Sequence, residues 1–317
     1  MKILLAGHKG MVGSSFEKKI KEKYPKHELI TIEKKYIDLL NQNLVLNFLE
    51  NHKFDTVINC AAKVGGIYSN NKYRADFIYE NLQIQNNLIH SSYTTGVKKF
   101  LFLGSSCIYP KFSEQPIKEE YLLTSPLEYT NEPYAIAKIA GIKMCESYYK
   151  QYGCNFISVM PTNLYGPNDN FHPQNSHVLP GLLHRVHLAK INNAPHVEIW
   201  GTGKAKREFM HVDDMVEACL QVLEKIDAQD LYSQNISQIN IGSGQEITIA
   251  ELAQKIAKTV GYNGEIKFDL SKPDGTLRKL LDSSRLNKLG YKPQISIDEG
   301  LKSTYNWYLN NQDKLKI

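Results

Sequence analysis

Residues 2–13 read KILLAGHKGMVG, a short apolar run that passes directly into a glycine-rich segment. The glycines recur at three-residue intervals, at Gly7, Gly10 and Gly13. Between a strand and a helix, such glycines allow a tight turn, a close approach of the backbone to a pyrophosphate and close packing of the helix on the sheet. A plain turn would also suit this pattern. The position of the glycines directly after the first apolar run favours a dinucleotide-binding loop at the start of a helix.

Short apolar runs alternate with amphipathic stretches along the first half of the chain. We predict strands at Lys2–Ala6, Glu28–Ile32, Thr56–Cys60, Phe100–Leu103 and Asn155–Met160, and helices at Met11–Lys23, Phe77–Thr95 and Tyr134–Tyr152. Strands that alternate with helices indicate an α/β protein with a doubly wound parallel sheet covered on both faces.

After Pro161 the pattern changes, and a loop is predicted over residues 165–174. Helices at His177–Ile191, Ile249–Val260 and Ile297–Leu309, with short strands at Val197–Trp200 and Ile239–Ile241, are predicted beyond it. We therefore expect a nucleotide-binding domain over residues 1–163 and a smaller α/β substrate domain over residues 164–317. The segment near 208–243 is expected to pack back onto the first domain.

The composition is ordinary for a soluble globular protein, with 317 residues, 42% of them hydrophobic and 22% charged. The net charge of +5 comes from scattered lysines, which argues against a nucleic-acid-binding tail and suits a small anionic ligand. Five cysteines without C-x-x-C spacing argue for a reducing compartment, and nothing resembles a zinc site. No stretch approaches the ~18 apolar residues of a membrane helix, and the first apolar run is too short for a signal peptide. We expect a cytoplasmic protein that contacts neither nucleic acid nor membrane.

Tyr134 and Lys138 form a Y-x-x-x-K pattern, which places both side chains on one face of the predicted helix. A neighbouring ammonium favours the phenolate, so we expect the Tyr134 pKa to fall below its ordinary ~10 and the phenol to act as an acid near neutral pH. Ser105 or Ser106, directly after an apolar strand, could hold a carbonyl oxygen. A surface pair of this spacing is common, but Tyr134 opens its helix after a strand that ends in serines. The trio suits hydride transfer to or from a C=O group.

Cys107 and His177 suggest chemistry beyond reduction. Taken singly, Cys107 would be a small buried hydrophobe and His177 a histidine at the start of a helix. The first follows the candidate catalytic serine, however, and the second opens the first helix of the second domain. Both carbons next to a sugar 4-ketone carry acidic protons, and inverting them needs a base on one face and an acid on the other. Cysteine and histidine, with ordinary pKa values of ~8.5 and ~6.5, suit that exchange.

The end of the second strand bears on the choice between NAD and NADP. Glu33 stands where a carboxylate could bind the ribose, which would favour NAD. Lys34 and Lys35 follow it, and Lys9 lies in the glycine-rich segment. Three cations around one pocket suit a 2′-phosphate, so NADP is favoured over NAD, although the lysines would also be ordinary as solvated surface charges.

Arg185, Arg207 and Lys279 are candidates for binding substrate phosphates or hydroxyls, because the guanidinium fork matches a diphosphate. The alternative for each is an ordinary surface cation.

Together these residues resemble the extended short-chain dehydrogenase/reductases, and within them the branch of the GDP-L-fucose synthases, which are GDP-4-keto-6-deoxymannose 3,5-epimerase/4-reductases. Three blocks are specific to this branch: AAKVGGI at 61–67, GSSCIYPK at 104–111 and MPTNLYGP at 160–167. Further matching blocks lie at 7–13, 131–147, 170–178, 207–215 and 271–282, so the resemblance spans nearly the whole chain. It implies a Rossmann-type NADP-binding domain, a GDP-sugar substrate and a homodimer.

The resemblance also implies a role for each matching residue. Ser105, Tyr134 and Lys138 match the reductase triad, and Cys107 and His177 match the epimerisation acid/base pair. The positions implied to contact the cofactor are Gly7, Lys9, Gly10, Met11, Val12, Gly13, Lys34, Ala61, Ala62, Leu103, Tyr134, Lys138, Pro161, Asn163, Leu164 and His177. Those implied to contact the GDP-sugar are Ser106, Cys107, Asn163, His177, Arg185, Trp200, Arg207 and Lys279. The clearest departure from the family is at residues 33–35, where relatives can carry arginine.

Other activities remain open at this point. The nearest is a C4 reductase without epimerase activity that acts on a related GDP-4-keto-6-deoxy sugar such as a heptose. A sugar 4,6-dehydratase is less favoured, because relatives of that type carry an acidic pair where Ser106 and Cys107 stand. A catalytically silent NADP-binding regulator would be expected to have a damaged triad, and all three residues are present.

Overall fold

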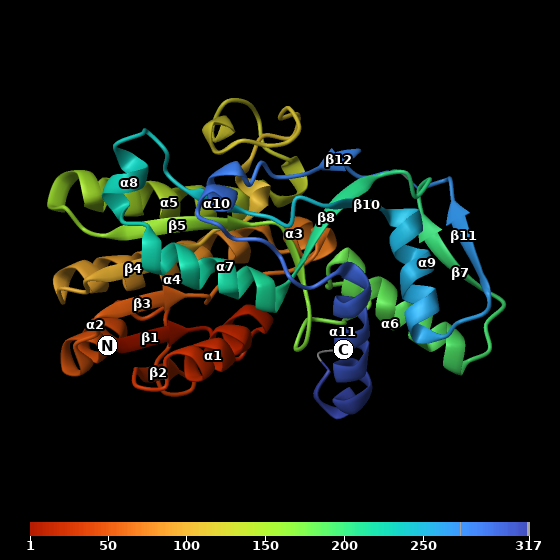
Figure 1. The fold of residues 1–317 in the computed structure, drawn as a ribbon, viewed down its shortest axis with the longest axis horizontal. Coiled ribbons are helices and arrows are strands. Elements are labelled where there is room, and N and C mark those ends of the chain that lie inside the picture. Colours follow the sequence, from red (N-terminus) through yellow and green to blue (C-terminus); the bar gives the residue numbers. More distant parts are fainter. Residues whose placement is uncertain (273, 316–317) are drawn as a thin grey trace.

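The structure is a computed structural model that describes residues 1–272 and 274–315. Its larger part is a six-stranded parallel sheet in the spatial order β2-β1-β3-β4-β5-β9 (Figure 1). The strands are β1 (Lys2–Ala6), β2 (Glu28–Ile32), β3 (Thr56–Asn59), β4 (Lys99–Leu103), β5 (Phe156–Pro161) and β9 (Ile239–Ile241). The predicted α/β class with a doubly wound parallel sheet is confirmed.

Alternate residues of the central strands enter two different hydrophobic cores. In β1, Leu4 and Ala6 face one core, whereas Ile3 and Leu5 face the other. Successive side chains of a strand point to opposite faces of the sheet, so a strand covered on both faces must be apolar throughout. This explains why the strands show unbroken apolar runs.

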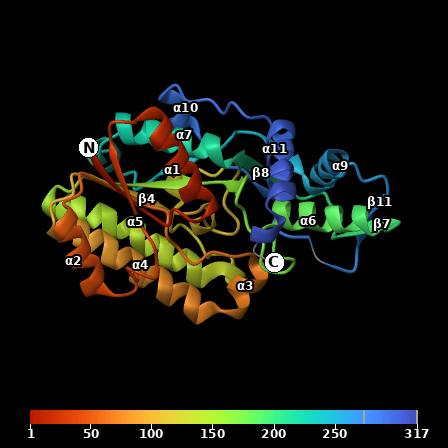
Figure 2. The ribbon, with the colours of Figure 1, turned by 90° about the horizontal axis from the view of Figure 1, so that it is seen from below.

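Helices cover both faces of the sheet, and Figure 2 shows the two layers on either side of it. One layer contains α2 (Gln42–His52), α4 (Arg74–Thr94) and α5 (Glu132–Tyr152), and the other contains α1 (Met11–Lys23), α7 (Val212–Lys225), α8 (Ala228–Tyr232) and α10 (Ser284–Lys288). Helix α4 begins three residues before the predicted start at Phe77, and α2 was not predicted. The short α3 (Ile67–Lys72) precedes α4.

The smaller part of the molecule has its own sheets and its own core. β6 (Asn163–Tyr165), β8 (Lys206–His211), β10 (Glu246–Thr248) and β12 (Arg278–Lys279) form one sheet, and β7 (His196–Trp200) pairs with β11 (Glu265–Asp269) in another. The helices are α6 (Val178–Ile191), α9 (Ile249–Val260) and α11 (Ile297–Asn310). Capping boxes begin both α9 and α11, at Thr248 with Glu251 and at Ser296 with Glu299, which satisfies the first N–H groups of each helix.

The chain returns to the large sheet after building part of the smaller unit. β9 pairs with β5 at the edge of the sheet, with Ile239 opposite Val159. α7 precedes β9 and packs beside α1, where Ser15 donates a hydrogen bond of 2.6 Å to Asp213. The division into residues 1–163 and 164–317 remains a prediction. Elements from beyond residue 163 contribute to a core of the large sheet as well as to the core of the smaller part.

Candidate active site

Ser105 and Cys107 leave the carboxyl end of β4 together. Ser105 has an extended backbone, and its Oγ accepts a hydrogen bond from the Cys107 N–H at 3.5 Å as the chain enters a 3-10 turn, η1 (Ser106–Ile108). Both side chains are half-buried, whereas Ser106 is buried, with 5% exposed. Of the two serines considered from the sequence, Ser105 is the one whose hydroxyl acts on Tyr134, whose pKa it lowers.

Tyr134 and Lys138 lie on the first turns of α5, as the Y-x-x-x-K spacing predicts. The Lys138 Nζ donates a hydrogen bond of 2.9 Å to the carbonyl of Leu103, the last residue of β4, and lies 5.9 Å from the centroid of the Tyr134 ring. The Phe77 ring packs edge-on against Tyr134, with the centroids 6.2 Å apart. The helix and the strand end are therefore joined at the residues that would do the chemistry.

Burial changes the acidity of this pair in a way that the sequence did not indicate. Burial raises the pKa of Tyr134, and the adjacent Cys107 acts in the same direction, while the hydrogen bond from Ser105 opposes them. Burial also lowers the pKa of Lys138 to about 8. The expectation that the Tyr134 pKa falls below its ordinary value is wrong, because burial disfavours the charged phenolate and Lys138 does not offset this.

Cys107 and His177 approach the site from the two parts of the molecule. Burial raises the pKa of the Cys107 thiol, although Lys279, Ser105 and Lys138 act against this. His177 is the N-cap residue of α6 but makes no capping hydrogen bond with its side chain. The protein around the imidazole lowers its pKa, and the positive charge of Lys279 contributes. Lys279 therefore lies close enough to influence both groups.

Lys279 and Arg207 are brought together by strand pairing. The two residues lie opposite each other in the parallel pair of β12 and β8. The Arg207 guanidinium donates to the carbonyls of Lys206, at 2.8 Å, and Thr276. Two of the three predicted substrate cations thus stand side by side near Cys107.

Two further substrate candidates lie in the smaller part, Arg185 on α6 and Trp200 at the end of β7. Arg185, on α6, donates a hydrogen bond of 2.8 Å to the carbonyl of Glu198, two residues before Trp200. Trp200 is 66% exposed, and the Lys272 Nζ lies 5.8 Å from its ring centroid. Within residues 1–272 and 274–315, no hydrogen bond, ion pair or cation–ring contact joins Arg185 or Trp200 to Arg207.

The glycine-rich segment forms a tight cradle against the end of β3. Gly7 has a φ of +87°, and a Cβ there would lie 2.6 Å from the Ala61 nitrogen. A Cβ on Gly13 would lie 2.2 Å from the Gly7 oxygen, whereas one on Gly10 would meet nothing nearer than 3.5 Å. Met11 and Val12 open α1, whose first N–H groups have no capping side chain at Gly10. This geometry fits a pyrophosphate at the point where the strand order reverses between β1 and β3.

The cations that bear on cofactor choice lie around Glu33. Its carboxylate accepts a hydrogen bond from Lys9 at 2.8 Å and lies 3.5 Å from the Lys35 Nζ. The Lys9 hydrogen bond and the nearby Lys35 charge lower the pKa of Glu33. Lys34 is exposed beside them. The carboxylate is thus engaged by lysines, which reduces its availability to a ribose and leaves a basic surface that suits a phosphate.

The predicted nicotinamide-side positions follow β5. Pro161 ends the strand opposite Ile241, and the Asn163 amide donates a hydrogen bond of 2.8 Å to the Glu208 carbonyl, with Leu164 next to it in β6. Ala62 follows Ala61 at the end of β3. Glu208 was not identified from the sequence. Its side chain is fully buried, and its carboxylate accepts hydrogen bonds from the N–H groups of Gly244 and Leu281, at 2.7 and 3.1 Å.

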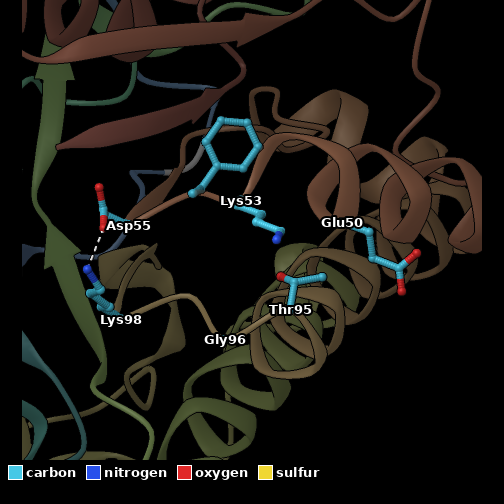
Figure 3. Close-up of a pocket in the computed structure, with 7 residues that line it drawn as sticks. Glu50, Lys53, Asp55, Thr95, Gly96 and Lys98 are labelled. Atoms are coloured by element: carbon cyan, nitrogen blue, oxygen red, sulfur yellow. Dashed lines mark hydrogen bonds and ion pairs between the residues drawn. The ribbon is translucent and has the colours of Figure 1, made fainter.

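Two surface hollows lie away from these residues. One, of about 540 Å³, is formed by Glu50, Lys53, Thr95 and neighbouring residues, and Figure 3 shows the Lys98–Asp55 ion pair of 2.7 Å on its wall. The residues that line it come directly before β3 and β4 in the chain. It therefore lies at the opposite end of the parallel strands from Ser105, which follows β4. The other, of about 530 Å³, is lined by Tyr165, His211 and residues of β10 and 293–297. Neither contains a predicted catalytic residue.

Two kinds of feature are absent from the part of the chain that the structure describes. No group of three or more His, Cys, Asp or Glu side chains there could hold a metal ion. No helix in it is long and apolar enough to cross a membrane.

Comparison with known proteins agrees with this geometry. Residues 3–242 match the NAD dependent epimerase/dehydratase family. The chain therefore belongs to that family.

The most similar proteins indicate which branch of this family the chain resembles. A GDP-L-fucose synthase from Escherichia coli K12 is 53% identical over 99% of this chain and 98% of its own length, and GDP-L-fucose synthase 1 from Arabidopsis thaliana is 55% identical over 98% and 94%. Among solved structures, a GDP-mannoheptose C4 reductase from Campylobacter jejuni with NADP bound has a TM-score of 0.88 and 40% identity, over 97% of this chain and 98% of its own. The resemblance to the GDP-L-fucose synthases is confirmed.

Proposed function

We propose that this protein uses NADPH to reduce the C4 ketone of a GDP-4-keto-6-deoxy sugar after exchanging the protons at C3 and C5. The observation that carries the proposal is the convergence of two acid/base sets at one place. Ser105 contacts both Tyr134 and Cys107, and the charge of Lys279 acts on both Cys107 and His177. A reductase that only moved hydride would need only the first set.

The reductive half rests on Ser105, Tyr134 and Lys138. NADPH supplies the hydride. Hydrogen bonds from Ser105 and Tyr134 hold the ketone oxygen and stabilise the charge that develops on it. The raised pKa keeps Tyr134 protonated at neutral pH, so it is ready to donate. Lys138, fixed by the Leu103 carbonyl, then stabilises the phenolate that remains.

The exchange half rests on Cys107 and His177. A raised thiol pKa and a lowered imidazole pKa leave both groups uncharged at neutral pH. One therefore holds a proton to give, and the other has a free nitrogen to accept one. Loss of a proton next to the ketone produces an enolate, and the same contacts from Ser105 and Tyr134 stabilise its oxygen.

The charged ligand groups have separate places to bind. Arg207 and Lys279 suit the diphosphate of the GDP-sugar, and Arg185 with Trp200 would contact its outer end. For the cofactor, the cradle at Gly7, Gly10 and Gly13 suits the pyrophosphate, with Lys9 and Lys34 near a 2′-phosphate. The NADP bound to the Campylobacter jejuni relative supports the same cofactor here.

A homodimer and a cytoplasmic location complete the proposal. The adjacent helices α4 and α5 expose Tyr79, Ile136 and Tyr152, by 62%, 43% and 48%, and such apolar area suits contact with a second copy. All five cysteines are free thiols, which suits a reducing compartment. Light scattering after gel filtration would measure the oligomeric state, and a monomer at micromolar concentration would contradict the dimer.

The decisive experiment is NMR of GDP-4-keto-6-deoxymannose with the enzyme in D₂O, before and after NADPH is added. Deuterium at C3 and C5, followed by GDP-L-fucose, would support both activities. Reduction without exchange would leave a C4 reductase. Turnover only of a heptose substrate would transfer the proposal to the activity that the Campylobacter jejuni relative is named for.

A further inference from the structure

Asn175 is held at two points by residues at the start of α3. Its main-chain carbonyl accepts a hydrogen bond of 2.9 Å from the Gly66 N–H. Its side-chain Oδ1 accepts one of 2.7 Å from the hydroxyl of Ser69, a residue only 6% exposed and 106 positions away in the chain. This double attachment, which we call the Ser69–Asn175 clasp, joins the larger part of the molecule to the loop that leads into α6.

The loop on one side of the clasp is well braced. The His172 Nδ1 accepts hydrogen bonds from the N–H groups of Gln174 and Asn175, at 3.1 and 3.2 Å. The Ser176 N–H donates to the His172 carbonyl at 3.2 Å. Only Ser176 separates Asn175 from His177. A displacement of Asn175 is therefore passed directly to His177.

On the other side, the clasp contacts the support of Tyr134. A Cβ added to Gly65 would lie 3.0 Å from the Ser69 Cβ and 3.3 Å from the Phe77 ring, so Gly65 packs against both side chains and links them. Phe77 in turn packs edge-on against Tyr134. A continuous series of contacts thus runs from the candidate proton donor for reduction to the candidate acid/base for exchange.

We infer that Ser69 and Asn175 are positioning residues for the proton exchange, and that their hydrogen bond sets where the His177 imidazole stands relative to Cys107 and Tyr134. The inference rests on the proposed function. Neither residue is placed against a reacting atom, so both act through His177. Proton transfer requires hydrogen-bond reach between the acid/base and the carbon it serves, and a displacement of about 1 Å can cost as much as 10²-fold in rate.

Gly66 adds a steric constraint at the same junction. A Cβ there would lie 2.5 Å from the main-chain oxygen of Ser176, the residue next to His177. Gly66→Ala would therefore displace the loop without touching a hydrogen-bonding side chain. It offers a second and independent way to disturb the position of His177.

The test compares Ser69→Ala, Asn175→Ala and the double variant with the wild-type enzyme. The readouts are deuterium exchange at C3 and C5 without NADPH, and the share of NADPH oxidation that gives unepimerised product. We expect exchange to fall roughly tenfold in each single variant, and the double variant to match Asn175→Ala, which also loses the 3.4 Å contact of its Nδ2 with the His172 Nε2. The dissociation constants of NADPH and GDP should stay unchanged. The control is Ser92→Ala, which removes a buried hydroxyl of α4 with no hydrogen-bond partner in the described chain.

The outcomes separate this inference from the proposed function. Wild-type exchange rates in Ser69→Ala and Asn175→Ala would overturn the inference and leave the function intact. Equal losses of exchange, NADPH affinity and thermal stability would also overturn it, because they would indicate general destabilisation. If the wild-type enzyme exchanges no deuterium, the epimerisation part of the proposed function fails and the inference fails with it. A selective loss of exchange in Gly66→Ala would support it further.

Discussion

The candidate acid/base residues stand on two very different supports. Tyr134 and Lys138 belong to a 21-residue helix that packs against the sheet and beside α4, and Lys138 is 4% exposed. His177 is an exposed residue at the end of a loop, and the contacts of Asn175 with α3 tie that loop to the rest of the molecule. In the proposed mechanism, the groups for reduction therefore belong to the buried core, whereas His177, one of the two groups for exchange, depends on contacts between segments far apart in the chain.

This contrast indicates that reduction and epimerisation can be separated by mutation. Residues on α5 are positioned by burial and main-chain hydrogen bonds, so a change there should act on hydride transfer directly. Residues of the smaller part are positioned by strand pairing and loop contacts. Changes there should act on exchange or on substrate binding and leave the core chemistry in place.

The largest effect is expected from Tyr134→Phe. Removing the proton donor should lower NADPH oxidation with substrate by on the order of 10²–10⁴-fold. Deuterium exchange at C3 and C5 should continue at a reduced rate, because Cys107 and His177 are intact but the enolate oxygen loses its contact with the Tyr134 hydroxyl. Cofactor oxidation followed by absorbance, alongside NMR in D₂O, measures both. A variant that oxidises NADPH at the wild-type rate would show that the assignment of Tyr134 is wrong.

His177→Asn should give the complementary result. Exchange should fall by roughly 10²-fold, since one acid/base is lost, while NADPH oxidation should continue and give product with unchanged configuration at C3 or C5. NMR of the product resolves the two carbons. An equal loss of exchange and reduction would contradict the separation of the two halves, and full exchange would remove His177 from the mechanism.

Arg207→Met and Arg185→Met compare a cation on β8, paired with Lys279, with a cation on α6 that contacts β7. Loss of a charge-assisted hydrogen bond to phosphate should weaken GDP binding in Arg207→Met by about tenfold or more. Arg185→Met should have a smaller effect, because Arg185 is exposed and already donates to the Glu198 carbonyl. Calorimetry with GDP measures both dissociation constants. Equal or reversed effects would contradict the placement of the diphosphate at Arg207 and Lys279.

The smallest effect is expected from pH. Lys138 is charged below its pKa of about 8 and neutral above it, so stabilisation of the Tyr134 phenolate should be lost as the pH rises through that value. The profile of kcat/KM for reduction should fall there by several-fold, because this parameter reports the free enzyme. Lys138→Met should abolish this limb. A profile in the variant that still falls near pH 8 would assign the limb to another group.

Local pattern was enough to predict much of the fold and part of the site. Apolar runs separated by helical stretches predicted the strands of the large sheet, and the bounds of β1, α1 and β2 agree with the structure. α2 was missed although Asn41 caps it, with a side chain that accepts the Leu44 N–H at 3.1 Å. Five of its 11 residues are apolar, Leu44, Val45, Leu46, Phe48 and Leu49, so the sequence contained both an N-cap and a helical pattern that indicate this helix.

By itself, the sequence determined which groups are available: the spacing of Gly7, Gly10 and Gly13, and the helical face shared by Tyr134 and Lys138. These are short-range patterns, and the regular geometry of a turn or a helix is enough to predict how such residues lie relative to one another. Only the tertiary structure decided that the charge of Lys279 acts on the pKa values of both Cys107 and His177, and that burial raises the pKa of Tyr134. Strand register and the exclusion of water depend on the whole chain at once, and no local window of residues contains them.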